Sequence, residues 1–300
     1  MKLVALIGGF LITILSWSQD FSGFRKINGA QLYFHIMGEG EPLVVIHGGP
    51  GLSYDYFLPH LRALSKNFKV VLFDLRANGK SAVPSSDSLQ LSFFVEDIEG
   101  IREMLGAEKI HLMAHSWGAL LAVAYASTYP KHVDDLILCS PVPLNKEYDK
   151  EMMEAQLSRT TGSDSTDRAI IKGSKAFREG KIQAFEKLMM LTFRNSFHKP
   201  SNFHKLQITF QPNYLASTGA LYAGLGKDLM QYDYYPTLKG LSFPVLLLHG
   251  KHDAIPETAV QRMKDELGHG ELEVFNKSGH FIFIEEPKKF TRTVTAFLKG

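Results

Sequence analysis

The sequence predicts an α/β protein with a mostly parallel sheet flanked by helices and an inserted helical cap domain. Short apolar runs alternate with helix-spaced apolar residues up to residue 141, and this alternation returns at residue 244. Between these parts, residues 144–240 show helical spacing and no strand alternation. At Ser116 an apolar run, residues 110–114, changes at once into an alanine-rich helix pattern. The predicted core is therefore residues 19–143 and 241–300, and the predicted cap is residues 144–240.

The core elements follow one another as a β-hairpin and then as alternating strands and helices. Asn28-Gly29 between two apolar runs is a strong hairpin signal. Several later strands are continuous apolar runs, as expected when helices cover both faces of a sheet. The expected strands are residues 24–27, 32–37, 43–46, 70–73, 110–114, 133–139, 244–248 and 272–275. The expected helices are residues 53–64, capped by Ser53, then 93–105, the run that starts at Trp117, 259–267 and 287–298.

The N-terminus has the form of a secretory signal peptide over residues 1–18. Lys2 is followed by the apolar run LVALIGGFLITIL and then by small residues typical of a cleavage site, and we expect cleavage after Ser18. The run is shorter than the roughly 20 residues of a spanning helix, so an uncleaved membrane anchor is the less favoured alternative. We expect a secreted or periplasmic protein with no stable membrane insertion after cleavage.

Composition indicates a globular protein with a mixed-charge surface. Hydrophobic residues make up 45% and charged residues 21% of the 300 residues, which is enough for a sizeable core. The net charge of +2 comes from 33 basic and 31 acidic residues without a dense basic run, so nucleic acid is not an expected partner. The single cysteine, Cys139, is expected in the core. His249, His252 and Asp253 lack a further ligand cluster, so neither a metal nor a cofactor is expected.

Three residue types needed for nucleophilic catalysis follow three of the expected strands. Ser116 follows residues 110–114, Asp253 comes soon after residues 244–248, and His280 follows residues 272–275. Because ligands bind at the carboxyl ends of the strands of an open parallel sheet, these side chains are placed where a substrate would lie. Ala114 and Gly118 are small residues on either side of Ser116, as a tight strand-to-helix turn requires. The pattern predicts a serine nucleophile; the structural alternative is a buried strand followed by an ordinary capped helix.

With these motifs the chain resembles the α/β-hydrolase superfamily, and the proline iminopeptidase family in particular. HGGPG at residues 47–51 is the most family-specific motif. The others are DLRANGKS at 74–81, AHSWG at 114–118, GKHDAIP at 250–256 and SGHFIFIEEP at 278–287. The resemblance covers most of residues 24–141 and 243–298 and implies an α/β-hydrolase fold. It does not extend to the predicted cap.

The resemblance and the chemistry of the residues imply the same catalytic roles. Ser116 is the expected nucleophile, His280 the base that activates it, and Asp253 the acceptor that orients His280. The backbone N–H groups of Gly49 and Trp117 are the expected oxyanion hole. The oxyanion loop also contains His47, Gly48, Pro50 and Gly51. Of the other polar residues, His47 and His115 are expected to brace their loops, and Asp74 and Arg76 to form a structural ion pair or loop network.

The predicted function is that of an exported serine hydrolase, most of all an aminopeptidase that releases N-terminal proline or similar residues from short peptides through an acyl-enzyme. The resemblance implies cap carboxylates that bind the free amine of the substrate. The tryptophan- and glutamate-containing cap motif of close relatives is absent, because the chain has no tryptophan besides Trp17 and Trp117. No pattern selects among the candidate acids Glu147, Glu151, Glu154, Glu179, Glu186, Asp228 and Asp233.

Two other functions stay open. A carboxylic-ester hydrolase or lactonase would use the same triad, and the Met-, Phe- and Tyr-rich cap would suit an apolar acyl group. A non-catalytic ligand-binding protein would keep the fold without turnover. For the aminopeptidase and for the ester hydrolase or lactonase, the expected partner is a small peptide or ester substrate.

Overall fold

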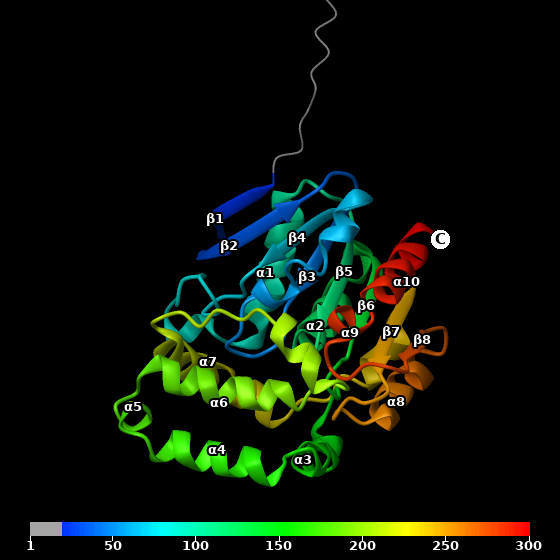
Figure 1. Cartoon of the computed structure of the whole chain (residues 1–300). Helices are drawn as coiled ribbons and strands as arrows, with labels where there is room; N and C mark the ends of the chain where they lie inside the picture. The colour runs from blue at the N-terminus through cyan, green and yellow to red at the C-terminus, as the bar shows by residue number, and fades with distance from the viewer. Residues whose placement is uncertain (1–19) are drawn as a thin grey trace, which may run out of the picture.

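An eight-stranded sheet organises residues 20–300, the part of the chain that this computed structural model describes (Figure 1). The strands are β1 (Phe21–Ile27), β2 (Ala30–Met37), β3 (Pro42–Ile46), β4 (Lys69–Phe73), β5 (Ile110–His115), β6 (Val133–Cys139), β7 (Val245–Gly250) and β8 (Glu271–Phe275). Their order across the sheet is β1-β2-β4-β3-β5-β6-β7-β8. The strands from β3 to β8 pair in parallel, whereas β2 is antiparallel to both β1 and β4. The predicted α/β class with a mostly parallel sheet is confirmed.

The predicted signal peptide, residues 1–18, lies outside the described residues. It stays a prediction, which the N-terminal sequence of the protein purified from expressing cells and from their medium would test. Among residues 20–300, no helix combines the length and the apolar character that crossing a membrane requires.

The first hairpin turns at the predicted residues. Asn28 and Gly29 both have positive φ, 43° and 78°, as the two-residue turns that match the twist of paired strands require. The pairing runs from Phe21 opposite Ile36 to Ile27 opposite Ala30. As a result, β1 forms one edge of the sheet.

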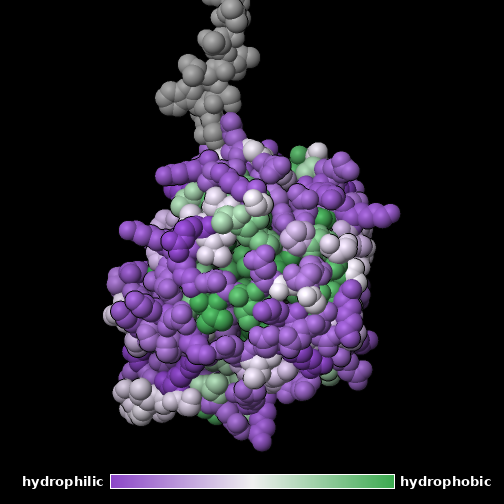
Figure 2. Space-filling view, turned by 90° about the vertical axis from the view of Figure 1, so that its right-hand side faces the viewer, coloured by the Kyte–Doolittle hydropathy of each residue, from purple (hydrophilic) through white to green (hydrophobic). Residues whose placement is uncertain are grey.

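Helices cover both faces of the sheet, because successive residues of a strand point to opposite sides. The core helices are α1 (Leu91–Met104), α2 (Gly118–Thr128), α8 (Glu257–Leu267), α9 (Ile282–Glu285) and α10 (Pro287–Lys299). Buried residues of α1, α2 and α8 share one core with Val44 and Val71, whereas those of α9 and α10 share another with Val45 and Leu72. Figure 2 views the side on which Figure 1 places α10 and β8; hydrophobic residues gather in the middle of this face and hydrophilic residues surround them.

The helix predicted over residues 53–64 is wrong. Two 3₁₀ helices stand there instead, η1 (Tyr54–Phe57) and η2 (Arg62–Lys66). Pro59 has no N–H to donate, and it disfavours a helical backbone at Leu58, which is extended with φ −83° and ψ 138°. Ser53 still caps the segment, since its Oγ accepts the N–H of Asp55 at 3.4 Å.

Five α-helices separate β6 from β7 and gather at one end of the sheet (Figure 1). They are α3 (Asp149–Ser158), α4 (Gly162–Gly173), α5 (Lys175–Arg178), α6 (Ile182–Arg194) and α7 (Tyr214–Met230), with the 3₁₀ helix η6 (Pro200–Lys205) between the last two. We call residues 144–240 the cap. Glu285 of α9 ties the cap to the core, because its carboxylate accepts the N–H groups of His198 and Lys199 at 2.9 Å and of Gly279 at 2.7 Å.

Candidate active site

Ser116 lies on a tight turn between β5 and α2. Its φ of 56° is in the left-handed region, which is rare for a residue with a side chain. The Ser116 N–H donates to the carbonyl oxygen of Cys139 at 3.0 Å, and the Ser116 carbonyl oxygen accepts the N–H of Ala119 at 3.0 Å. At Gly118 an added Cβ would lie 2.6 Å from the carbonyl oxygen of His47, so glycine lets α2 approach the loop after β3. The strand–turn–helix geometry expected around Ser116 is present.

Asp253 and His280 meet between the loops that follow β7 and β8. His280 Nδ1 lies 2.8 Å from Asp253 Oδ2, and the Asp253 side chain is only 2% exposed. Burial opposes ionisation of Asp253, but the charge and the hydrogen bond of His280 outweigh it and lower the pKa of Asp253 to about 2. The ionised carboxylate therefore accepts the Nδ1–H of His280 at neutral pH. In the neutral form of the ring, this contact leaves Nε2 unprotonated.

Hydrogen bonds between the cap and backbone groups hold both of these loops. The N–H of His280 donates to the carbonyl oxygen of Ser196 at 2.8 Å. The guanidinium of Arg159 donates to the carbonyl oxygen of Asp253 at 2.6 Å and also to that of His252. Within the loop after β7, which we call the acid loop, the N–H of Ile255 donates to Asp253 Oδ1 at 3.1 Å. The positions of the acid and of the histidine thus depend on cap residues distant in sequence.

The loop after β3 presents the N–H of Gly49. His47 Nε2 accepts the N–H of Leu75 at 3.1 Å, so its proton is on Nδ1, which donates to the carbonyl oxygen of Gly48 at 2.7 Å. Burial lowers the pKa of His47 to about 4, which keeps the ring neutral. Because a trans peptide holds its C=O and N–H on opposite sides, this bond turns the Gly49 N–H away from His47. Within residues 20–300, no hydrogen bond occupies the N–H of Gly49 or of Trp117.

A cavity of about 320 Å³ lies between the candidate catalytic side chains and the cap. Ser116, Asp253 and His280 line it from the core, together with Ala254 and Ile255. The cap side is lined by Asp149, Met152, Met153, Gln156 and Ser196, and Val142 comes from the segment before the cap. The cavity therefore combines five apolar side chains with two serines, a glutamine, a histidine and two carboxylates, those of Asp149 and Asp253.

A family described as "alpha/beta hydrolase fold" matches residues 41–287 of the chain. The chain belongs to the α/β-hydrolase family. It is 30% identical to a proline iminopeptidase of Heyndrickxia coagulans over 294 residues, which covers 93% of this chain and 98% of that protein. A proline iminopeptidase of Clostridium botulinum is 27% identical over 92% of this chain and 97% of its own length. The solved structure of a proline iminopeptidase from Mycobacterium smegmatis has a TM-score of 0.69 at 19% identity, covers 93% of this chain and 98% of that one, and shows the fold alone.

The α/β hydrolase brings the predicted triad residues to one cavity and holds Asp74 and Arg76 in two separate networks. Asp74 and Arg76 do not pair with each other: Asp74 accepts the N–H groups of Tyr54 and Lys80, at 2.9 and 2.8 Å. Arg76 instead forms a buried ion pair with Asp97 of α1, with Nε 2.7 Å from Oδ2. Both networks shape the loop after β4 and contribute no residue to the cavity.

Sequence reasoning missed the acid that the α/β hydrolase places in its cavity. Asp149 was absent from the candidate acids, and none of those acids lines the cavity. Glu147, for example, pairs with Arg262 at 2.5 Å, and Asp228 accepts the N–H of Leu91 at 2.7 Å. The N-terminal position of Asp149 on a helix is the one local signal it carries, and that signal describes many surface acids as well.

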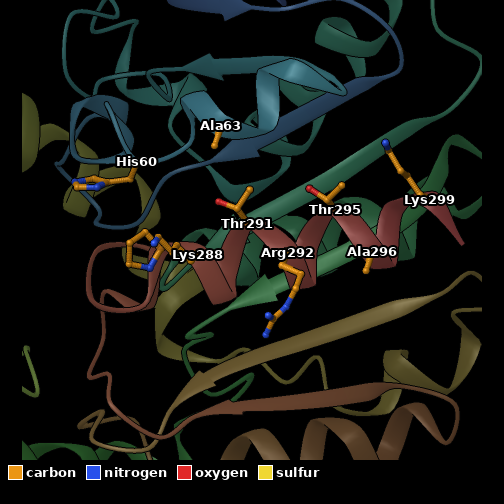
Figure 3. Close-up of a pocket in the computed structure, with 9 residues that line it drawn as sticks. His60, Ala63, Lys288, Thr291, Arg292, Thr295, Ala296 and Lys299 are labelled. Carbon is orange, nitrogen blue, oxygen red and sulfur yellow. The ribbon is translucent and has the colours of Figure 1, made fainter.

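A larger cavity of about 660 Å³ lies between α10 and the segment around η2 (Figure 3). Its labelled residues include His60 and Ala63 on one side and Lys288, Thr291 and Arg292 on the other. The lining contains no Asp or Glu that would orient a histidine, and His60 Nε2 is within 3.2 Å of the carbonyl oxygen of Lys205. This groove is therefore not the candidate catalytic site.

Proposed function

We propose that this α/β hydrolase is a serine aminopeptidase that releases N-terminal proline or a similar residue from short peptides. One observation carries the proposal: the cavity of Ser116 and His280 also contains the carboxylate of Asp149. A peptide with a free N-terminus has its ammonium group next to the first scissile carbonyl, so it needs an acid near the nucleophile. The similarity to proline iminopeptidases over nearly the whole chain supports the same substrate class.

The proposed reaction runs through an acyl-enzyme. Ser116 Oγ attacks the carbonyl carbon of the first residue while His280 Nε2 takes the hydroxyl proton. The N–H groups of Gly49 and Trp117 stabilise the negative charge that develops on the carbonyl oxygen. His280 then gives its proton to the leaving amine as the peptide bond breaks. A water molecule, deprotonated by His280, releases the free amino acid and restores Ser116.

Asp149 is the proposed anchor for the substrate ammonium. It is the first residue of α3, where the partial positive charge of the helix end favours the ionised carboxylate. Within the described residues, no hydrogen bond or ion pair occupies its carboxylate. Asp253, the other carboxylate of the cavity, is already engaged by His280. Asp149 is therefore the carboxylate that remains for an amine.

Prolyl and alanyl arylamides, each with a free and with an N-acetylated amine, test the proposal. The wild-type protein is expected to turn over the free-amine substrates faster. Asp149→Asn should lower kcat/KM for them by about 10- to 100-fold, the effect of losing one hydrogen bond to a charged group. Turnover of the acetylated substrates should not fall. A preference of the wild-type protein for the blocked substrates would refute the peptidase proposal.

Glu151→Gln is the matched control for Asp149→Asn. It makes the same change from carboxylate to amide in the first turn of the same helix. Because Glu151 does not line the cavity, kcat/KM should stay within about twofold of the wild-type value, as for a surface charge. Equal losses in both variants would show that the net charge of α3, and not a contact with Asp149, is responsible.

A carboxylic-ester hydrolase is the second candidate, and the apolar lining favours it. Val142, Met152, Met153 and Ile255 line the cavity next to Ser116 and would pack against an alkyl or aryl acyl group. Activity on short-chain aryl esters without activity on free-amine arylamides would select this function. A ligand-binding protein would bind with unchanged affinity after Ser116→Ala and show no turnover as wild type.

A further inference from the structure

Three hydrogen bonds, two of them buried and the third part-buried, join the oxyanion loop to the loop of His280. The N–H of Gly48 donates to Tyr56 Oη at 2.5 Å. Tyr56 Oη lies 3.0 Å from His115 Nδ1, and His115 Nε2 lies 3.0 Å from the carbonyl oxygen of His280. Tyr56 is fully buried and His115 is 2% exposed, so water does not compete for these groups. This chain of hydrogen bonds passes next to Ser116, which follows His115 in the sequence.

The chemistry of the groups sets the direction of every hydrogen bond. Tyr56 Oη accepts from an N–H, so its own proton is available for His115 Nδ1. His115 then carries its proton on Nε2, which donates to a carbonyl oxygen that can only accept. Burial raises the pKa of Tyr56 well above its usual value and lowers the pKa of His115 to about 3, so both groups stay neutral. Within the chain, the Tyr56 hydroxyl and the His115 ring each accept one hydrogen bond and donate one, between the N–H of Gly48, which donates, and the C=O of His280, which accepts.

The hydrogen-bond chain packs against Ser116 at its Gly48 end and against the ring of His280 at its other end. A Cβ added to Gly48 would lie 2.9 Å from the Cβ of Ser116 and 3.2 Å from Tyr56 Oη. The rings of His115 and His280 have centroids 4.7 Å apart, and those of Tyr56 and His115 are 5.4 Å apart. A displacement of Tyr56 would therefore shift both the oxyanion loop and His280.

We propose that Tyr56 and His115 are positioning residues that align the oxyanion N–H of Gly49 and the base His280 with Ser116. Gly48 is held on both sides, with its N–H on Tyr56 and its C=O on His47, so the plane of the next peptide is set. That peptide carries the N–H of Gly49. The other end of the chain holds the backbone of His280. Both ends are backbone groups, so the chain positions the site and passes no proton to Ser116.

The inference rests on the serine hydrolase function proposed above, and Tyr56→Phe tests it. The variant keeps the ring and removes the hydroxyl that joins Gly48 to His115. The rate constant for inactivation by an alkyl fluorophosphonate and kcat for an aryl acetate should each fall about 10- to 100-fold, as expected when buried polar partners lose their hydrogen bond. KM should stay within about threefold. The amount of fluorophosphonate bound per molecule should remain that of the wild type, which excludes partial unfolding as the cause.

Tyr125→Phe is the matched control. Tyr125 is a fully buried tyrosine of α2 whose hydroxyl donates to Glu99 at 2.9 Å, and it does not line the cavity. The variant should be less stable than the wild type because it loses this buried hydrogen bond, while its rate of inactivation by the fluorophosphonate stays within about twofold of the wild-type rate. An equal loss of rate in Tyr125→Phe and Tyr56→Phe would assign the effect to general destabilisation and overturn the inference.

The outcomes separate this inference from the proposed function. If the fluorophosphonate does not label Ser116 of the wild-type protein, the hydrolase proposal fails. If it labels Ser116 in wild type and in Tyr56→Phe at the same rate, the positioning role fails. Should Tyr56→Phe not fold, His115→Phe tests the same role from the other end, because it removes the bond to the carbonyl oxygen of His280 and leaves the Tyr56 hydroxyl to accept the N–H of Gly48. A wild-type labelling rate in that variant would equally overturn the inference.

A measurement on the unaltered protein tests the direction of the chain. In ¹⁵N NMR of the histidine rings, His115 should have an unprotonated Nδ1 and a protonated Nε2 throughout the range from about pH 5 to pH 8, in which an ordinary histidine titrates. The opposite tautomer, or a charged ring in this range, would contradict the hydrogen-bond chain whatever the variants do.

Discussion

The change of Asp253 to asparagine is the sharpest test of the catalytic geometry. Asparagine has nearly the same shape, and its Oδ1 can still accept the N–H of Ile255, which is 3.1 Å away in the wild-type protein. The group that faces His280 Nδ1 at 2.8 Å then becomes an NH₂ donor in place of an acceptor. His280 can keep a hydrogen bond only by moving its proton to Nε2. In that tautomer the ring cannot take the proton of Ser116.

The expected loss follows from that tautomer change. In a Ser-His-Asp triad it lowers kcat by about 10⁴-fold, which is about 5.4 kcal/mol of transition-state stabilisation at 1.36 kcal/mol per factor of ten. The assay is kcat on the best arylamide or ester, normalised to the concentration of folded protein. KM should change little, because Asp253 is engaged by His280 rather than left for the substrate.

Glu257→Gln is the control in the same region. Glu257 is 43% exposed and pairs with Lys251 at 2.6 Å, so its loss changes a surface charge near the acid loop and nothing inside the cavity. Its kcat should stay within about twofold of wild type. If Asp253→Asn retains more than about a tenth of the wild-type kcat, the assignment of Asp253 as the orienting acid is refuted.

Two further predictions concern stability. Asp97→Asn leaves the guanidinium of Arg76, itself 1% exposed, without its counter-charge and should lower the free energy of unfolding by about 3–5 kcal/mol in urea titrations, whereas replacing both residues by apolar ones should cost much less. Burial opposes ionisation of Glu99, but hydrogen bonds led by that of Arg102 outweigh it and lower the pKa of Glu99 to about 2, below its usual 4.5. The ionised Glu99 therefore stabilises the fold above pH 4.5, and this stabilisation is lost as the pH falls through about 2. The Tm difference between wild type and Glu99→Gln should accordingly be full at neutral pH and vanish below about pH 2; a difference independent of pH would contradict it.

The fold class and the meeting of Ser116, Asp253 and His280 at one cavity were predictable from local patterns. Strand and helix periodicity depends on neighbouring residues, and the carboxyl ends of parallel strands converge on one edge whatever the loops contain. This is why Ser116, Asp253 and His280 could be placed together although they are far apart in sequence. The same local reasoning failed for residues 53–64, where the apolar spacing predicted a helix that Pro59 breaks.

The tertiary structure alone decided which cap acid shares a cavity with Ser116 and how the loops around Ser116 are held. Asp149 resembles the other acids of the cap in sequence, and only the path of the chain back over the sheet puts it into the cavity. Tyr56 and His115 are 59 residues apart, and no spacing rule predicts a hydrogen bond over that distance. The sequence by itself thus determined the sheet, the tight turn at Ser116 and the chain order of the three candidate residues, because these follow from periodicity and strand ends. Substrate-facing groups and hydrogen-bond partners depend on contacts between distant segments, and these exist only once the chain has folded.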